Sequence, residues 1–364
     1  MQIFTDFFPN IHPGYPIEKL APLDKILFID IETTGLSREL TDLYLIGCGY
    51  FTGDCYNTIQ WFADSPDDEP GILNAFNDFV SGRFTLLIHY NGNHFDIPYL
   101  KAKAMKHSLA LPFDKMDALD IYCELKPYKK LLGLTSLRQR AVEELLMINS
   151  DDPYSGKDLI SVYGRYVNNP SDSLLKPLIY HNSEDLKGMA YILPALYYTD
   201  LKDLRLEYVS YGIHEYNDYS DVKHRELLVT YSHNLKLPAG FNCREGDIML
   251  HVGPEGKATL RLPIIETTLK QFYPDHKNYY YLPAEDTCIF KSAAHGVPAQ
   301  RRENAKKETC YTRHSGLFIP VLAGSASPIL KSDYSSKELY TPFIEDKCPS
   351  LLMDLGLKIV AHIL

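Results

Sequence analysis

The sequence is poor in paired cysteines, in long apolar runs and in positive charge. Its seven cysteines are scattered, odd in number and never spaced as Cys-x-x-Cys, which argues against a zinc finger and favours reduced thiols. No apolar run approaches the ~20 residues that a membrane span requires. The opening stretch, MQIFTDFFPN, lacks the basic flank and long apolar core of a signal peptide. We therefore expect a cytoplasmic protein with no membrane partner.

The shortage of positive charge limits the partners less than it first suggests. A formal net charge of −10 makes the surface as a whole a poor binder of polyanions. However, a cluster of metal-binding carboxylates counts as negative until cations fill it. The length of 364 residues is enough for two domains of ordinary size. Composition therefore leaves both an enzyme and a binding protein open.

The first part of the chain alternates between strand and helix patterns. Apolar and β-branched runs bounded by turn residues predict strands, and apolar residues at helical spacing predict helices. Strands that come early and helices that come late favour an α/β domain. The predicted strands are residues 25–33, 43–51, 57–64, 84–92 and 116–122, and the predicted helices are 71–82, 97–109 and a long helical region from 124 to about 200.

The character of the sequence changes past residue 205. The stretches DIMLHV and KATLRL, joined by GPEG, are typical of a β-hairpin. We therefore divide the chain into an N-terminal lead-in (1–24), an α/β domain (25–204) and a β-rich accessory domain of unknown function (205–364).

Two acids stand out in FIDIETTGL, residues 28–36. Asp30 and Glu32 are two apart on a predicted strand, so their side chains point to the same face. Side-by-side carboxylates repel one another unless cations lie between them. An exposed strand end would also explain the pair, but the apolar residues 26–29 indicate a buried strand. A site is the better interpretation.

A further acid, Asp96, lies in YNGNHFDIPYL, residues 90–100. Taken alone it reads as an acid in the first turn of a helix, where it complements the helix dipole. In open α/β sheets, however, sites gather where strands end and helices begin. Asp96 is thus placed where it could join Asp30 and Glu32.

The stretch YHNSEDL, residues 180–186, supplies the last candidates. His181 and Asp185 are four apart on a predicted helix, which stacks them on one face. Tyr180 and Glu184 form the neighbouring pair. A lone histidine on a helix is usually structural, but four acids from three separated segments are harder to dismiss.

The order DIETTGL, YNGNHFDIPYL and HNSEDL resembles the three exonuclease motifs of the DEDD 3′–5′ exonucleases, in the ribonuclease H-like superfamily. The intervening DALDIY and LLGLTSLRQRAVEELL are similar to the YprB-type branch of predicted exonucleases. The resemblance covers about residues 25 to 200. It implies a mixed five-stranded sheet with helices on both faces, followed here by the β-rich domain.

The resemblance also implies roles for individual residues. It implies two divalent ions, Mg²⁺ or Mn²⁺, and hydrolysis of DNA or RNA from a single-stranded 3′ end, releasing nucleoside 5′-monophosphates. The metal ligands implied are Asp30, Glu32, Asp96 and Asp185, and the residues implied to border the substrate are Thr33, Thr34, Gly35, Leu36, Asn91 and Phe95.

The general base is the point at which the sequence departs from the family pattern. Histidine-type members place the base five residues before the last aspartate, and tyrosine-type members place it four before. Here His181 is four before Asp185 and Tyr180 is five before it. A near-neutral pKa suits histidine for this role, so His181 is the preferred base and Tyr180 its rival.

Other features leave alternatives open. A structure-specific endonuclease could use the same metal site. A protein that binds nucleic acid without catalysis is the alternative that is not an enzyme. The residues from Tyr279 to Tyr281 could stack on bases, although neighbouring residues of a strand face opposite ways. Two basic groups could contact phosphates, although solvated surfaces usually carry such residues: Lys126, Lys129, Lys130, Arg138 and Arg140, and Arg301, Arg302, Lys306 and Lys307.

Overall fold

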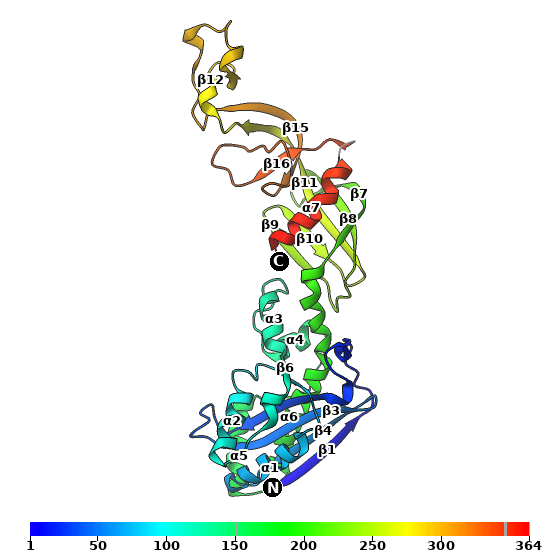
Figure 1. The fold of residues 1–364 in the computed structure, drawn as a ribbon. Coiled ribbons are helices and arrows are strands. Elements are labelled where there is room, and N and C mark those ends of the chain that lie inside the picture. Colours follow the sequence, from blue (N-terminus) through cyan, green and yellow to red (C-terminus); the bar gives the residue numbers. More distant parts are fainter. Residues whose placement is uncertain (150, 346–347, 364) are drawn as a thin grey trace. The chain divides into compact units, whose positions relative to one another are not determined.

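The computed structural model describes residues 1–149, 151–345 and 348–363 (Figure 1). The chain divides into two compact units. The first comprises Met1–Asp200 with Leu237–Ala239, and the second comprises Leu201–Lys236 with Gly240–Leu364. Within the described part, no helix is both long and apolar enough to cross a membrane.

A mixed six-stranded sheet forms the centre of the first unit, in the order β1-β4-β3-β2-β5-β6. The neighbours from β1 to β2 are antiparallel, whereas β2, β5 and β6 are parallel. All five predicted strands are present, and the lead-in contributes a sixth, β1, along the edge of β4. The strands are β1 (Gln2–Phe8), β2 (Ile26–Thr33), β3 (Leu43–Thr52), β4 (Cys55–Phe62), β5 (Leu86–His89) and β6 (Asp117–Asp120).

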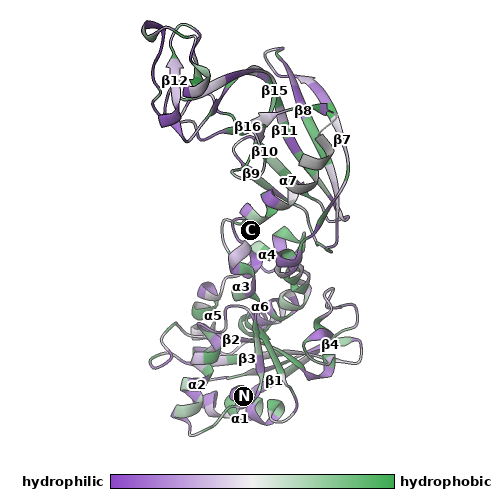
Figure 2. Ribbon diagram, turned by 45° about the horizontal axis from the view of Figure 1, so that its top comes forward, coloured by the Kyte–Doolittle hydropathy of each residue, from purple (hydrophilic) through white to green (hydrophobic). Residues whose placement is uncertain are grey.

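Helices cover both faces of this sheet, as the sequence predicts. On one face, Trp61 of β4 packs edge-on against Phe76 of α1 (Glu69–Val80). On the other, the Nε2 of Gln60 donates to the carbonyl of Ile179 in α6 (Asp172–Tyr191). Consecutive residues of β4 thus face opposite helices, because strand side chains alternate. Figure 2 shows hydrophobic residues concentrated in the central strands that lie between these helices.

The single long helical region predicted from 124 to about 200 is wrong, because loops break it into separate helices. Gly133 and Met147 both adopt left-handed backbone conformations, with φ of 67° and 58°, which no α-helix can contain. A capping box between Ser155 and Asp158 starts a new helix. The helices around these breaks are α2 (Asp96–Lys106), α3 (Ile121–Leu125), α4 (Gln139–Leu145), α5 (Gly156–Asn168) and α6.

The second unit is β-rich, as expected. Its long strand β11 pairs with β8 and β10 through its first half and with β15 through its second half. The seven-stranded antiparallel sheet consists of β7 (Leu206–Asn217), β8 (Lys223–His233), β9 (Phe241–Glu245), β10 (Ile248–Val252), β11 (Lys257–Phe272), β15 (Tyr311–Val321) and β16 (Leu339–Pro342).

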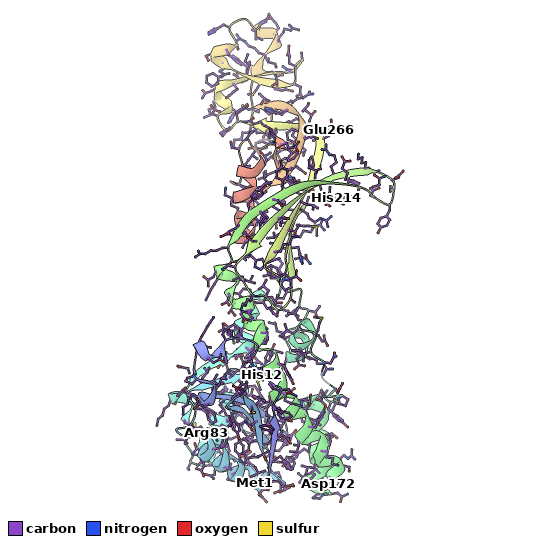
Figure 3. All side chains as sticks on the ribbon, turned by 90° about the vertical axis from the view of Figure 1, so that its right-hand side faces the viewer. Met1, His12, Arg83, Asp172, His214 and Glu266 are labelled. Carbon is purple, nitrogen blue, oxygen red and sulfur yellow. The ribbon has the colours of Figure 1, made fainter. Side chains whose placement is uncertain are left out.

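Two further elements complete the second unit. The first is a small sheet in the order β13-β12-β14, formed by Tyr279–Leu282 (β12), Thr287–Phe290 (β13) and Glu303–Asn304 (β14). The second is α7 (Cys348–Ile363), a helix that the sequence reading missed. Figure 3 shows the β7–β8 hairpin and labels His214 on β7. Nδ1 of His214 lies 3.0 Å from Oε1 of Glu226 on β8.

Candidate metal centre and active site

Three segments bring the four predicted acids together. Asp30 and Glu32 lie near the end of β2, the strand between the antiparallel and parallel halves of the sheet. Asp96 is the first residue of α2, and its Oδ1 accepts a hydrogen bond of 3.3 Å from the backbone N–H of Ile31. That bond fixes the start of α2 against β2. Asp185 comes from α6, which packs on the same strand.

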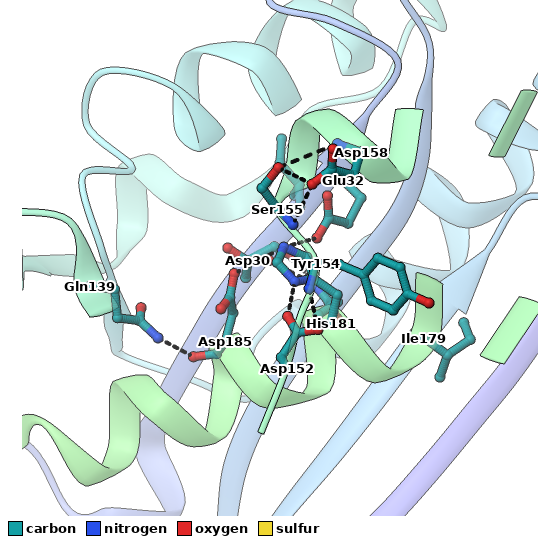
Figure 4. Close-up of polar contacts among 12 residues, drawn as sticks. Asp30, Glu32, Gln139, Asp152, Tyr154, Ser155, Asp158, Ile179, His181 and Asp185 are labelled. Atoms are coloured by element: carbon teal, nitrogen blue, oxygen red, sulfur yellow. Dashed lines mark hydrogen bonds and ion pairs between the residues drawn. The ribbon is translucent and has the colours of Figure 1, made fainter. Parts of the chain in front are cut away.

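His181 lies beside Asp30, Glu32 and Asp185 (Figure 4). Its Nε2 is 3.7 Å from Oε1 of Glu32 and 3.7 Å from Oδ2 of Asp185. One ligand atom from each of Glu32, His181 and Asp185 can be chosen so that all three lie within 4.8 Å of one another. The predicted pairing of His181 with Asp185 on one helix face is therefore present.

The electrostatics of the acids reflect crowding. Burial raises the pKa of Asp30 well above its ordinary value, and the charges of Asp185, Glu32 and Asp96 raise it further. Burial also raises the pKa of Glu32 to about 8, although His181 opposes the rise. The same cause raises the pKa of Asp96 to about 7 and that of Asp185 to about 6. Each shift means that four negative charges are costly here without a cation.

A buried amide network holds Asp30. The Nδ2 of Asn182 donates to Oδ2 of Asp30 at 2.7 Å, while the Oδ1 of Asn182 accepts from the Nε2 of Gln60 at 2.8 Å. The network needs Gly47 on β3, since a Cβ at that position would lie 2.0 Å from the Asn182 oxygen. Sequence reasoning missed both amides, because nothing in their spacing connects them to Asp30.

A second residue that sequence reasoning missed is Asp152, in the loop before α5. Its Oδ2 accepts a hydrogen bond from Nδ1 of His181. Because an ionised carboxylate only accepts, Nδ1 carries the hydrogen, and Nε2 of a neutral His181 then presents a lone pair toward the acids. Burial lowers the pKa of His181, but the charges of Glu32, Asp185 and Asp152 outweigh it and raise the pKa overall.

Tyr180, the rival base, has different surroundings. Its ring is 41% exposed, and the ammonium of Lys187 lies 5.9 Å from the ring centroid. Burial and the charge of Glu184 raise its pKa, which disfavours the ionised form that a base requires. Lys187 and Glu184 of its own helix and the charges of Asp151 and Asp152 act on Tyr180, whereas Nε2 of His181 lies 3.7 Å from Glu32 and from Asp185.

The backbone of Asp185 is also held in place. The Nε2 of Gln139, at the start of α4, donates to the carbonyl of Asp185 at 3.0 Å and to Oε1 of Glu143 at 3.0 Å. Gly188 permits this approach, since a Cβ there would lie 2.4 Å from the Gln139 nitrogen. The segment LRQRAVEELL thus contributes a side-chain hydrogen bond to the backbone of α6 that was not predicted.

The predicted substrate-bordering residues form the loop after β2 and the turn before α2. The hydroxyl of Thr33 donates to the carbonyl of Gly35 at 2.8 Å, and the hydroxyl of Thr34 accepts from the N–H of Asp42 at 2.8 Å. Both threonines therefore shape the loop itself. Leu36 is 87% exposed at its tip.

The turn before α2 depends on a buried acid outside the predicted set. Asn91 has φ of 59°, and its N–H donates to Oδ1 of Asp120 at 2.8 Å. The N–H of Asn93 donates to the other oxygen of Asp120 at 3.2 Å. Phe95 precedes α2 directly and packs against Tyr99. Asp120 thereby sets the conformation that presents Asp96.

The first basic group lies on the surface between α3 and α4. Lys126 and Lys130 are exposed, as are Arg138 and Arg140, while Lys129 is half-buried.

The donor set fits hard divalent cations. All four acids offer carboxylate oxygens, which Mg²⁺ and Mn²⁺ prefer. Within residues 1–149, 151–345 and 348–363, none of the four forms an ion pair with a lysine or arginine. A cluster of acids that no lysine or arginine neutralises is the arrangement that metal ions would neutralise.

Comparison with known protein families supports the fold of the first unit. Residues 27–197 match the family model described as the RNase_H superfamily, and this range contains the four acids and His181. Together with the mixed sheet and the helices on both faces, the match gives the first unit a ribonuclease H-like α/β fold. No curated protein matches the chain.

Solved structures add a distant likeness. One matching chain is "The zinc ion bound form of crystal structure of E.coli ExoI-ssDNA complex", at 13% sequence identity and a TM-score of 0.29. The match covers 43% of this chain and 43% of that chain. The chain thus spans less than half the length of that structure.

Proposed function

We propose that the protein is a metal-dependent 3′–5′ exonuclease of the YprB-type branch, acting on single-stranded 3′ ends of DNA or RNA. The observation that carries the proposal is the meeting of four carboxylates from β2, α2 and α6, two of which, Glu32 and Asp185, lie 3.7 Å from Nε2 of His181. Two cations held by Asp30, Glu32, Asp96 and Asp185 would supply Lewis-acid chemistry to a phosphodiester.

The side chains of the site supply the remaining functions. His181 takes a proton from the attacking water at Nε2, because Asp152 holds its Nδ1–H on the opposite side of the ring. Asn182 fixes the Asp30 carboxylate, and Ile31 fixes that of Asp96. The loop of residues 33–36 and the turn that holds Asn91 and Phe95 border the terminal nucleotide.

A cytoplasmic location fits this activity. Six cysteines have free thiols in the described part of the chain, among them Cys48 and Cys243 in the two units. Free thiols persist in reducing compartments.

The decisive experiment is a single-turnover assay with Mn²⁺ on 3′-labelled single-stranded DNA and RNA. The wild-type chain should release labelled nucleoside 5′-monophosphates, and Asp30→Asn or Asp185→Asn should abolish release while the fold is kept. Asp54→Asn, which changes an exposed acid in the turn between β3 and β4, is the matched control and should be fully active. Full activity in either site variant would contradict the two-metal proposal.

The endonuclease alternative predicts a different outcome in the same assay. An exonuclease requires a free end, so a circular single-stranded substrate should resist cleavage. Linear products from the circle that disappear in Asp30→Asn would assign the site to an endonuclease.

A further inference from the structure

The small sheet β13-β12-β14 of the second unit has two different faces. Tyr279 and Tyr281 point to one face, where they pack against buried Cys288, Ala305 and Cys310. Tyr280 points to the other face and is half-buried. The alternation follows from strand geometry, so the Tyr280 face is the one opposite this small apolar cluster.

Tyr280 holds two cations on that face. The ammonium of Lys291 lies 5.1 Å from its ring centroid, and the guanidinium carbon of Arg302 lies 4.6 Å from it. A nitrogen of Arg302 also donates to the carbonyl of Ala294 at 2.9 Å. Attraction between each cation and the ring restrains two long side chains that would otherwise move freely. Both charges are thereby kept beside the same ring.

The surrounding segment adds charge of the same sign. Residues 287–307 contain five basic residues and one acid, Glu303, for a formal charge of +4 in a chain of −10. Arg261, elsewhere in this unit, is by contrast paired with Glu226. Within the part of the chain that the structure describes, no carboxylate forms an ion pair with any of the five: Lys291, Arg301, Arg302, Lys306 and Lys307.

We propose that this Tyr280 face, formed by Tyr280, Lys291 and Arg302, binds the backbone phosphates of a single-stranded nucleic acid. A planar guanidinium pairs with a phosphate through two parallel hydrogen bonds, and an ammonium adds a point charge beside it. Arg301, Lys306 and Lys307 raise the local potential that attracts the strand. The choice of nucleic acid among polyanions rests on the proposed nuclease function.

Binding is tested in the full chain carrying Asp30→Asn, in EDTA, so that hydrolysis plays no part. Anisotropy of fluorescein-labelled (dT)20 is measured between 50 and 200 mM NaCl, concentrations of about the range over which phosphate contacts are lost. Lys291→Gln and Arg302→Gln should each weaken binding and reduce the slope of log K against log salt by about 0.7, and the double variant by about 1.4.

The tyrosine is tested by a pair of variants. Tyr280→Leu should weaken binding about fivefold, because both cation–π contacts are lost. Tyr280→Phe keeps the ring and should bind as the parent does. Circular dichroism of both variants confirms that the sheet is folded. Equal weakening by Leu and Phe would contradict the positioning role.

Matched controls separate the face from general charge. Lys257→Gln removes an exposed lysine from β11, and Arg244→Gln removes an arginine that also donates to a carbonyl, that of Gly246. Both should leave the salt slope unchanged. Slopes equal to those of Lys291→Gln and Arg302→Gln would overturn the proposal. If poly-glutamate competed as strongly as unlabelled (dT)20, the proposal would also be overturned, because the face would then bind acidic peptides as well as nucleic acid.

The outcome is independent of the proposed activity. Binding that depends on Tyr280, together with no hydrolysis by the unmutated chain in Mn²⁺, would uphold the face and refute the nuclease. Hydrolysis without such binding would do the reverse.

Discussion

At the scale of single residues, the two candidate bases differ in what they face. His181→Ala should lower the single-turnover rate by about 10²–10⁴-fold, the usual contribution of a general base, and should still bind Mn²⁺ through the acids. Tyr180→Phe should keep nearly the full rate, because Tyr180 is 41% exposed and its raised pKa disfavours the ionised form that a base requires. The reverse pattern would assign proton transfer to Tyr180.

Asp152 is expected to act through His181. Asp152→Asn should lower kcat by about 10–100-fold, typical of a lost carboxylate partner to a site histidine, with little change in KM. Nitrogen NMR of His181 should also show the hydrogen no longer confined to Nδ1. Asp151→Asn changes the exposed neighbouring acid and should alter neither readout. Unchanged kcat and tautomer in Asp152→Asn would show that the contact is only structural.

The sequence could predict the acids but not what orients them. Asp30 and Glu32 share a strand face by simple periodicity, and His181 and Asp185 share a helix face. Asp152 and Asn182 acquire their roles only when distant segments meet, so their spacing carries no signal. The capping box of Ser155 and Asp158 was readable in the sequence and would have placed the start of α5 just after Asp152.

At the scale of elements, a buried ion pair joins α1 to α2 beside the sheet. Glu69 accepts from Nζ of Lys103 at 2.8 Å and from the N–H of Leu43 at 3.0 Å. Burial alone would raise the pKa of Glu69, but these bonds and His107 lower it to about 2. A lowered pKa adds stability above the unfolded value of 4.5, and that stability is lost as the pH falls from 4.5 to about 2.

Glu69→Gln should therefore destabilise the first unit at pH 7 by about 3–5 kcal/mol, because Lys103 is left buried without a countercharge. The variant should also lose the steep acid dependence between pH 4.5 and 2. Urea unfolding followed by the fluorescence of Trp61 measures both. Trp61 is the single tryptophan and is buried against Phe76 of α1, so its signal reports this unit alone.

The control is an exposed ion pair that involves the same helix, α2. Lys101 on α2 pairs with Asp114 at 2.7 Å, and both side chains are exposed. Asp114→Asn should therefore barely change the urea midpoint of the Trp61 transition. Equal losses for Glu69→Gln and Asp114→Asn would show that burial does not govern the effect.

The elements themselves were predicted unevenly, for physical reasons. Buried strands such as β2 and β3 are continuous apolar runs and are readable. The edge strand β1 has exposed Ile3 and Phe7, and only its pairing with β4 makes it a strand. Helical periodicity hid the breaks at Gly133 and Met147, because apolar spacing continues across them.

At the scale of the whole molecule, two compact units with separate sheets imply two separable unfolding transitions. Metal that binds only the folded first unit should stabilise that unit and leave the other unchanged. At a free Mn²⁺ concentration of about one hundred times Kd, the gain is about 2.7 kcal/mol. In a urea titration, the midpoint reported by Trp61 should rise accordingly.

The second unit provides the internal reference in the same experiment. It contains no tryptophan, so its unfolding is seen as a change in far-UV circular dichroism without a change in Trp61 fluorescence. Mn²⁺ should leave the urea midpoint of this change where it is. The variant Asp30→Asn with Asp96→Asn should lose the Mn²⁺ shift of the Trp61 transition, because two carboxylate ligands are gone. Equal shifts of both transitions, or a shift that survives in the variant, would place the metal outside the four acids, since all four lie in the first unit and the variant removes two of them.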